Sequence, residues 1–394
     1  MIPVSRTHSF LLCLALTAAA VLLPLSPAAA QPDPEPSASR VADSRLVLDG
    51  TSYSSWHAFL RDRALDPEDR RCGTPEPEMR RVLYPAPDGA ELPPPLPGVA
   101  TAADCSAGST NPSSDYDTTF RWVIPVVVHN LLTSDCGTGY LSDSNVQGQI
   151  DILNEDFQAI LGSNGENGNN LEIHFELATV DPDGSPTSGI NRICDTSWYQ
   201  DGDAYYDFLA WDPDRYLNIY TNNAGGFLGY VPFLPADAGG AFVGNNTDRV
   251  VILHTAFGPD APLVPYNLGR TATHEVGHYL GLEHTFHGAC GTQSSPGCYA
   301  SGDLICDTNG ESEPYLGCAG PRSTCGTPDP YTNYMNYADD PCMEEFTVEQ
   351  GRRMRCSLQH YRPDLGTMEP IAAGLIFTDG FESGDVSVWS KASP

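Results

Sequence analysis

The sequence predicts an α+β fold in which short strands precede a helix rich in histidine. Strand-like runs of β-branched and aromatic residues are interspersed with helical spacing of apolar residues between positions 120 and 280. Hydrophobic residues make up 40% of the 394-residue chain, which is enough for a packed core. The 37 glycines and 34 prolines predict many loops, and beyond residue 284 the chain is mostly loop.

The charge balance excludes several classes of partner. The chain has 51 acidic and 20 basic residues, and its formal net charge is −31. Such a surface repels phosphate backbones and anionic lipids, which argues against nucleic acid and membrane surfaces as partners. Twelve cysteines are many for a protein kept in a reducing compartment.

Residues 1–30 have the pattern of a secretory signal peptide. Arg6 supplies the positive charge, residues 10–25 are almost wholly apolar, and residues 28–30 are small, as at a cleavage site. The alternative is a membrane anchor, but the apolar run is short and two prolines interrupt its end. No later stretch approaches eighteen apolar residues. We therefore predict a secreted, soluble protein in which disulfides can form.

The rest of the chain divides into three parts. Residues 31–115 are proline-rich and lack periodic pattern apart from a short helix at 56–62, so they are predicted to be a pro-segment or linker. A folded domain is predicted over residues 116–365. Residues 366–394 are predicted to form a tail.

The elements of this domain follow from local patterns. Residues 120–128 predict a strand, with Pro125 at a bulge or an edge position. Residues 142–161 predict an amphipathic helix capped by Ser142 or Ser144. Further strands are predicted at 171–180, 216–220 and 249–254, an exposed edge strand within 225–233, and a helix at 346–361.

Residues 274–284 read His-Glu-Val-Gly-His-Tyr-Leu-Gly-Leu-Glu-His and predict a metal site. On a helix, His274 and His278 lie one turn apart and face the same way, so their imidazoles can bind one Zn²⁺ ion. Glu275 is rotated around the helix and can take a proton from a water on the metal. Gly281 permits the left-handed backbone that leaves the helix and returns His284 as the third ligand.

Three protein ligands leave one coordination position open, as in a catalytic rather than a structural zinc site. The alternative is three histidines that are merely satisfied by hydrogen bonds. The short His-Glu-x-x-His motif alone would not decide between these, but Gly281 and His284 make a chance match far rarer.

The extended pattern resembles that of the metzincin zinc peptidases. This clan also requires a methionine turn, and residues 333–337, Asn-Tyr-Met-Asn-Tyr, are similar to it. The resemblance implies that Met335 forms an apolar floor beneath the imidazoles. It also implies that Tyr337 points toward the zinc, where it binds the metal or hydrogen-bonds the tetrahedral intermediate.

Within the clan, the chain resembles the pappalysins, and the ulilysin-like bacterial members in particular. The resemblance runs from about residue 120 to residue 362. It is carried by eight segments in order: 217–220, 225–230, 265–271, 284–286, 306–308, 333–337, 340–343 and 346–347. Together they are far more specific than the metal motif alone.

This resemblance implies a metzincin-like architecture with a mixed twisted sheet, an active-site helix and a loop-rich, disulfide-clamped C-terminal subdomain. The edge strand would hold a polypeptide substrate in extended form. The family pattern also implies structural Ca²⁺, with Asp303 and Asp307 as candidate ligands, although solvated loop carboxylates are the alternative. It implies two disulfides, Cys306–Cys325 and Cys318–Cys342. Separately, Cys290 and Cys298 are close enough in sequence to pair.

Residues 71–76, Arg-Cys-Gly-Thr-Pro-Glu, resemble the pro-segment cysteine of the same family. The resemblance implies that the Cys72 thiolate occupies the open zinc position and keeps a zymogen latent. Of the twelve cysteines, Cys13 lies in the signal, and setting Cys72 aside leaves ten, enough for five disulfides. The alternative is that Cys72 pairs with another cysteine.

One feature departs from the family. Members that favour basic side chains after the scissile bond have an acidic residue just before the cysteine at 342, where this chain has Pro341. Asp339 and Asp340 lie immediately upstream, so a preference for arginine or lysine does not follow from the resemblance.

Taken together, these residues predict a secreted, zinc-dependent endopeptidase made as a latent zymogen. Two alternatives remain: a secreted zinc-binding protein without catalysis, and a zinc hydrolase of a non-peptide bond. The presence of Glu275 and of all three histidines argues against the first alternative.

Overall fold

The computed structural model of the chain describes residues 46–48, 51–53, 71–85 and 100–371. The predicted signal at 1–30, the predicted helix at 56–62 and most of the predicted tail lie outside these residues. In the part of the chain that is described, no helix is both long and apolar enough to cross a membrane.

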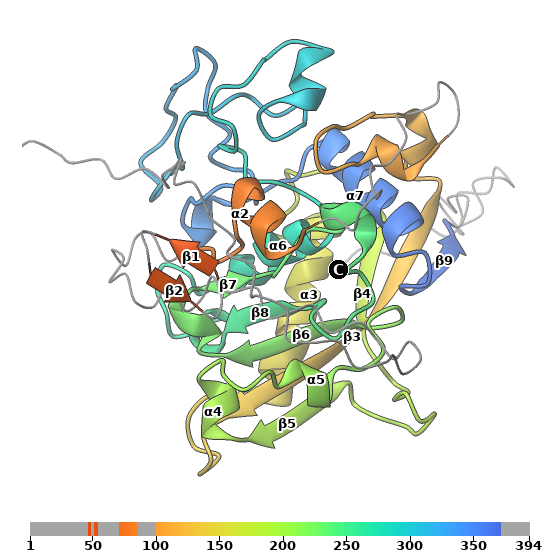
Figure 1. The fold of residues 1–394 in the computed structure, drawn as a ribbon, viewed down its shortest axis with the longest axis vertical. Coiled ribbons are helices and arrows are strands. Elements are labelled where there is room, and N and C mark those ends of the chain that lie inside the picture. The colour runs from red at the N-terminus through yellow and green to blue at the C-terminus, as the bar shows by residue number, and fades with distance from the viewer. Residues whose placement is uncertain (1–45, 49–50, 54–70, 86–99, 372–394) are drawn as a thin grey trace, which may run out of the picture.

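A seven-stranded mixed sheet forms the centre of the molecule (Figure 1). Five of its strands run parallel to one another, and two run antiparallel to their neighbours at the margins of the sheet. The parallel group comprises β3 (Phe120–Leu132), β4 (Ile173–Leu177), β5 (Ile190–Cys194), β6 (Leu217–Asn222) and β8 (Val250–Leu253). The antiparallel strands are β7 (Gly229–Tyr230) and β9 (Thr367–Pro370). β7 ends the strand order, which confirms the predicted edge strand.

Pro125 occupies neither a bulge nor an edge strand, because β3 is an interior strand of the sheet and its register with β4 continues without interruption through Pro125. The backbone groups of Trp122 and Val126 bond toward the β4 side. Pro125, one residue out of phase, therefore directs its nitrogen to the other side. There the pairing with β9 ends at Val123 and the pairing with β6 begins at Val126. Proline is tolerated because it faces this gap, where no partner needs its missing N–H.

Two helices cover one face of the sheet and build the main core. α3 (Asp143–Gln158) is capped by Ser142, whose hydroxyl accepts a hydrogen bond from the Asn145 N–H. Its apolar side and that of α6 (Arg270–Tyr279) pack into one cluster with the inward residues of β3, β6 and β8. α4 (Thr196–Tyr199) and α5 (Tyr206–Leu209) lie with the aromatic cluster on the opposite face.

The remaining elements are short or peripheral. α7 (Val348–Tyr361) begins with a capping box at Thr347. α2 (Pro77–Leu83) and the hairpin of β1 (Leu46–Leu48) and β2 (Thr51–Tyr53) belong to the N-terminal part. The 3₁₀ helices are η2 (Ala102–Asp104), η3 (Ser114–Tyr116), η4 (Ala224–Gly226), η5 (Asp237–Gly240), η6 (His254–Ala256), η7 (Gly297–Ala300) and η8 (Asp340–Cys342).

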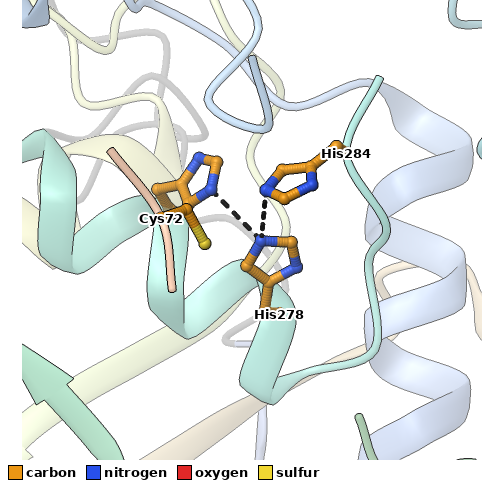
Figure 2. A group of neighbouring side chains, drawn as sticks. Cys72, His278 and His284 are labelled. Atoms are coloured by element: carbon orange, nitrogen blue, oxygen red, sulfur yellow. Dashed lines mark hydrogen bonds between the residues drawn. The ribbon is translucent and has the colours of Figure 1, made fainter. Parts of the chain in front are cut away.

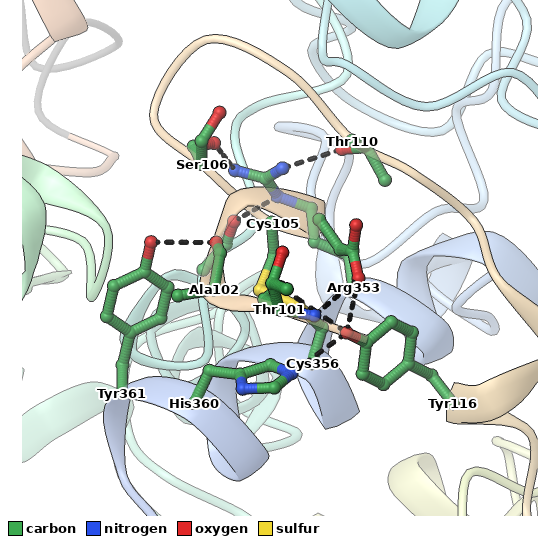
Figure 3. Close-up of a disulfide and its surroundings, with 12 residues drawn as sticks. Thr101, Ala102, Cys105, Ser106, Thr110, Tyr116, Arg353, Cys356, His360 and Tyr361 are labelled. Carbon is green, nitrogen blue, oxygen red and sulfur yellow. Dashed lines mark hydrogen bonds between the residues drawn. A yellow bond between two sulfur atoms is a disulfide. The ribbon is translucent and has the colours of Figure 1, made fainter. Parts of the chain in front are cut away.

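A disulfide between Cys105 and Cys356 fixes residues 100–116 to α7 (Figure 3). The Arg353 guanidinium from α7 donates to the Ser106 carbonyl at 2.8 Å and to the Thr110 hydroxyl at 2.6 Å. Since β9 also joins the sheet, the folded body extends beyond the predicted range of 116–365 on both sides.

The described residues contain five disulfides and one free cysteine, Cys72, as the cysteine count predicts. The predicted pair Cys318–Cys342 is present. The predicted pairs Cys306–Cys325 and Cys290–Cys298 are wrong. The structure instead joins Cys290 to Cys325 and Cys298 to Cys306, and it pairs Cys136 with Cys194.

The loop after α6 explains this exchange of partners. A Cβ atom on Gly291 would lie 2.8 Å from the backbone nitrogen of Gly302, so the loop crosses itself closely where glycine leaves room. This crossing and helix η7 place Cys298 beside Cys306 and leave Cys290 facing Cys325.

Candidate metal centre

The three histidines of the 274–284 motif meet at one buried point. The Nε2 atom of His278 lies 3.1 Å from that of His274 and 3.0 Å from that of His284. Figure 2 shows the side chains of Cys72, His278 and His284 converging from separate segments. In the described part of the chain, Cys72 and these histidines form the one group with the spacing of a metal site, and their ligand atoms all lie within 4.8 Å.

The hydrogen bonds of these rings indicate that a cation belongs between them. His274 Nδ1 lies 2.7 Å from the Tyr334 carbonyl oxygen, and His278 Nδ1 lies 2.7 Å from the Leu282 carbonyl oxygen. A carbonyl only accepts, so each Nδ1 carries the proton and each Nε2 presents a lone pair. Two lone pairs that face each other at 3.1 Å cannot share a hydrogen bond.

Zinc fits this donor set. Imidazole nitrogens at about 2.0–2.1 Å from a tetrahedral ion are about 3.3 Å apart, close to the separations observed here. Burial, followed by the neighbouring imidazoles, lowers the pKa of His274 and of His278 well below the ordinary value, so both rings are neutral. Neutral imidazoles with their Nδ1–H groups held by carbonyls are suited to bind a metal through Nε2.

Glycines at two positions allow the backbone to build the cluster. Gly281 has a φ of +102° and, as predicted, turns the chain out of α6 so that His284 returns to the other two rings. At Gly277 a Cβ atom would lie 2.4 Å from the Met335 sulfur. The methionine therefore packs directly against α6 beneath the histidines, where any larger residue would displace it.

Glu275 is fully buried beside the cluster. Its Oε2 accepts a hydrogen bond from the Thr74 hydroxyl at 3.1 Å and a longer one from the Cys72 thiol at 3.7 Å. Its Oε1 has no hydrogen-bond partner within the described residues. Burial raises the pKa of Glu275 to about 8, although the bonds from Cys72 and Thr74 oppose the rise. A carboxyl with a raised pKa is suited to exchange protons near neutral pH.

The ring of Tyr337 lies close to the rings of His284 and His274. Its ring centroid lies 5.0 Å from that of His284 and 5.9 Å from that of His274. It packs with Phe286 and Cys72 in a small buried cluster. The structure thus brings Glu275, Met335 and Tyr337 together with the three histidines, as the sequence predicts.

Segment 71–85 covers the cluster. Cys72 forms a parallel bridge with Gly229 of the edge strand β7, and the Gly73 N–H donates to the Gly229 carbonyl at 2.8 Å. The Thr74 hydroxyl accepts from the Val231 N–H at 2.9 Å. Glu76 reaches His284 Nδ1 and His287 Nδ1, each at 3.5 Å. The start of the segment is therefore held against the edge strand by a single bridge, with its cysteine at the metal position.

Arg71 fills a small pocket beside the cluster. Arg270, Thr271, His274, Glu275 and Met343 line it together with Arg71 itself. The guanidinium donates to the Tyr337 carbonyl and lies 4.4 Å from the centroid of the Tyr266 ring. It is 3.9 Å from the Asp339 carboxylate. Burial lowers the pKa of Arg71, and Tyr266, Asp340 and Asp339 oppose the decrease.

Sequence analysis missed a buried carboxylate that supports the cluster from behind. Asp156 of α3 accepts from the Thr273 hydroxyl at 2.6 Å and from the Tyr334 hydroxyl at 2.8 Å, and it lies 3.3 Å from the Arg270 guanidinium. Two of these partners belong to α6, and Tyr334 supplies the carbonyl that orients His274. The only sequence signal was an acidic residue next to the apolar face of a predicted helix.

The two calcium candidates are engaged in local hydrogen bonds. Asp303 is buried and accepts from the Thr308 hydroxyl at 2.7 Å and from the Ile305 N–H at 3.1 Å. Asp307 accepts from the Glu349 N–H at 2.9 Å. Within the described residues, neither belongs to a group with metal-site spacing.

Comparisons with known proteins agree with this geometry. Residues 203–359 match the family model described as pregnancy-associated plasma protein-A, a peptidase family. An extracellular metalloprotease of Pyricularia oryzae is 33% identical over 300 residues, which are 74% of this chain and 89% of that protein. Extracellular metalloprotease 1 of Coccidioides posadasii is 34% identical over 229 residues, which are 57% of this chain and 72% of that protein.

Two solved structures are also similar to this chain. A promirolysin mutant from Tannerella forsythia is 31% identical with a TM-score of 0.52, covering 65% of this chain and 87% of that one. Mature mirolysin in complex with a cleaved peptide is 34% identical with a TM-score of 0.50, covering 63% of this chain and 98% of that one.

Proposed function

Since this chain belongs to the pappalysin family of metzincin metallopeptidases and is ulilysin-like, we propose that it is a secreted zinc endopeptidase made as a latent zymogen. The observation that carries the proposal is the buried convergence of three imidazole Nε2 atoms beside Glu275. The relatives are named extracellular metalloproteases, in agreement with the predicted signal peptide at 1–30.

His274, His278 and His284 would hold the zinc ion, and Met335 would support them from below. Bound there, zinc supplies Lewis acidity toward the scissile carbonyl and the attacking water. Glu275 takes a proton from that water and later delivers it to the leaving amine. The Tyr337 ring lies beside the imidazoles of His274 and His284, where its hydroxyl would hydrogen-bond the developing oxyanion.

The substrate would be an extended polypeptide added to β7. Segment 71–85 supports this assignment, because its Gly73 N–H bonds to the Gly229 carbonyl as a strand would, and its Thr74 hydroxyl accepts from the Val231 N–H. The mirolysin structure in complex with a cleaved peptide supports a polypeptide as the substrate.

Latency would rest on Cys72. Its thiol lies among the histidines, and the Oε2 atom of Glu275 accepts bonds from Cys72 and Thr74, so the segment occupies the metal position and the base together. Residues 31–115 would then contain a pro-segment, residues 116–365 the catalytic domain, and residues 366–394 a tail. Residues 100–116 would stay with the mature enzyme through the Cys105–Cys356 disulfide.

Replacing Cys72 with alanine is expected to activate the unprocessed chain. A tethered ligand acts at an effective concentration on the order of millimolar, so its loss should raise activity about tenfold or more. Casein cleavage by the full chain measures this, with gel electrophoresis showing that no processing has occurred. Ser109→Ala, in the segment of residues 100–116 that the Cys105–Cys356 disulfide fixes to α7, is the matched control. A Cys72→Ala chain as latent as the wild type would contradict the cysteine switch.

The pocket around Arg71 predicts the cleavage preference. A guanidinium already lies there between the Tyr266 ring and Asp339, so a substrate arginine in the same pocket would be accepted next to the scissile bond. Mass spectrometry of a protein digested by the matured enzyme is expected to show arginine enriched at one position flanking the cleaved bonds. Asp339→Asn should weaken this enrichment, while Asp183→Asn should not.

The same digest tests the function itself. A zinc-binding protein without catalysis would release no peptides, and a hydrolase of another bond would leave the polypeptide intact. Phenanthroline should abolish cleavage if the metal is required. Structural calcium at Asp303 and Asp307 stays a prediction, which elemental analysis of the purified chain would test.

A further inference from the structure

A second arginine of segment 71–85 is buried between two carboxylates. Arg80 of α2 is 2% exposed; its Nε donates to Asp237 at 2.7 Å and its Nη2 to Glu283. The remaining donor, Nη1, bonds to the Pro75 carbonyl within the same segment at 2.7 Å. The rest of the molecule thus offers this guanidinium two acidic partners from two separate elements.

Asp237 and Glu283 lie at the far end of α6 from the Arg71 pocket. The pocket is lined by Arg270 and Thr271, which begin the helix, whereas Glu283 follows the turn that ends it. A ten-residue helix is about 15 Å long. Segment 71–85 therefore crosses the histidine cluster with one arginine on each side of it.

Asp237 and Glu283, called the acidic pair below, form a site that favours a bound cation. Burial raises the pKa of Asp237, although Arg80 opposes the rise. Both carboxylates are buried beneath segment 71–85, Asp237 at 7% and Glu283 at 4% exposure. Once Arg80 leaves, two neighbouring carboxylates lose the cation that they share, and another cation that replaces it is favoured.

We propose that Asp237 and Glu283 form a subsite for a substrate arginine, on the opposite side of the scissile bond from the Arg71 pocket. Arg80 occupies this subsite in the latent chain and vacates it on maturation. The proposal rests on the proposed endopeptidase function and adds a second point of substrate recognition to it.

Arginine fits this pair better than lysine. Arg80 uses two different nitrogens of one planar group to reach Asp237 and Glu283, which a single ammonium group cannot reproduce with the same geometry. In the latent chain, the Pro75 carbonyl accepts a hydrogen bond from the third nitrogen of Arg80, Nη1. This carbonyl leaves with the segment, and a water molecule can accept the corresponding hydrogen bond from a substrate arginine.

The test uses the full chain matured by proteolysis and a set of fluorogenic peptides. Each peptide carries arginine, or its neutral isostere citrulline, at one position on the side of the scissile bond away from the Arg71 pocket. At one position, arginine is expected to raise kcat/KM about tenfold or more over citrulline. Asp237→Asn and Glu283→Gln should each reduce that preference, measured as the ratio of kcat/KM for the arginine and citrulline forms of the same peptide. Asp183→Asn, an exposed control with the same charge change, should keep it.

Binding gives a second readout that does not depend on turnover. A synthetic peptide of residues 71–85 is titrated onto the matured Glu275→Gln chain, alongside the same peptide with citrulline in place of Arg80. The citrulline peptide is expected to bind about tenfold more weakly.

The outcomes separate the two proposals. If no peptide is cleaved, the endopeptidase function fails, and equal binding of the two titrated peptides would overturn the subsite as well. If the titrated peptide binds more weakly without Arg80 but cleavage shows no preference for arginine, Asp237 and Glu283 serve only to anchor the segment. That result would overturn the substrate subsite. An unchanged preference for arginine over citrulline in the Asp237→Asn and Glu283→Gln chains would also overturn the proposed subsite.

Discussion

The Glu275→Gln chain, matured by proteolysis, is expected to bind zinc normally and to cleave peptides about 10²- to 10⁴-fold more slowly than the wild type. Glutamine keeps the shape of the side chain but has no site for the proton that the attacking water must lose. The unprocessed chain should fold with this change, because Oε1 already lacks a hydrogen-bond partner within the described residues and the amide oxygen can accept from Thr74.

Steady-state kinetics with a fluorogenic peptide and zinc analysis of the same samples measure this effect. Glu176→Gln, an exposed residue of β4, is the matched control and should retain full activity. Unchanged turnover in Glu275→Gln would refute the assignment of the base. A loss of zinc together with activity would show that the residue acts on the metal site instead.

The His278→Ala chain is expected to lose zinc on dialysis and nearly all of its activity. The Nε2 atom of His278 is the one close to both other rings, at 3.1 and 3.0 Å, so its removal leaves two nitrogens to hold the ion. Removing a metal that stabilises charge by several kcal/mol lowers the rate by about 10³-fold or more.

Elemental analysis before and after dialysis gives the zinc content, and casein cleavage gives the activity. His174→Ala on β4 removes an imidazole outside the cluster and should affect neither quantity. If His278→Ala retains stoichiometric zinc, the three rings do not form the site proposed here. Recovery of activity at high zinc concentration would instead support weakened binding at the same site.

Both predictions depend on features that are local in sequence. The spacing of His274 and His278 places two rings on one helix face, and Gly281 supplies the left-handed residue that ends the helix. The capping residue of α3 and the buried side of that helix are likewise set by nearby residues. Such elements can be predicted, because their geometry depends on backbone periodicity over a few turns.

The disulfides show where sequence reasoning fails. The family pattern predicts Cys318–Cys342 correctly but gives Cys306 the wrong partner, and proximity along the chain gives Cys290 the wrong partner. Their pairing depends on the path of a loop whose crossing at Gly291 and Gly302 has no periodic signal. Proximity along the chain is a poor guide when a loop folds back on itself.

The amino-acid sequence by itself determined the metal-binding helix and the chemistry of its histidines and glutamate. Only the tertiary structure decided which distant groups surround them: the carboxylate of Asp156 behind α6 and the acidic pair that holds Arg80. Contacts within a helix follow from its repeat, whereas the contacts of Arg80 join residues that are 157 and 203 positions apart. Packing of the whole chain is what brings such residues together.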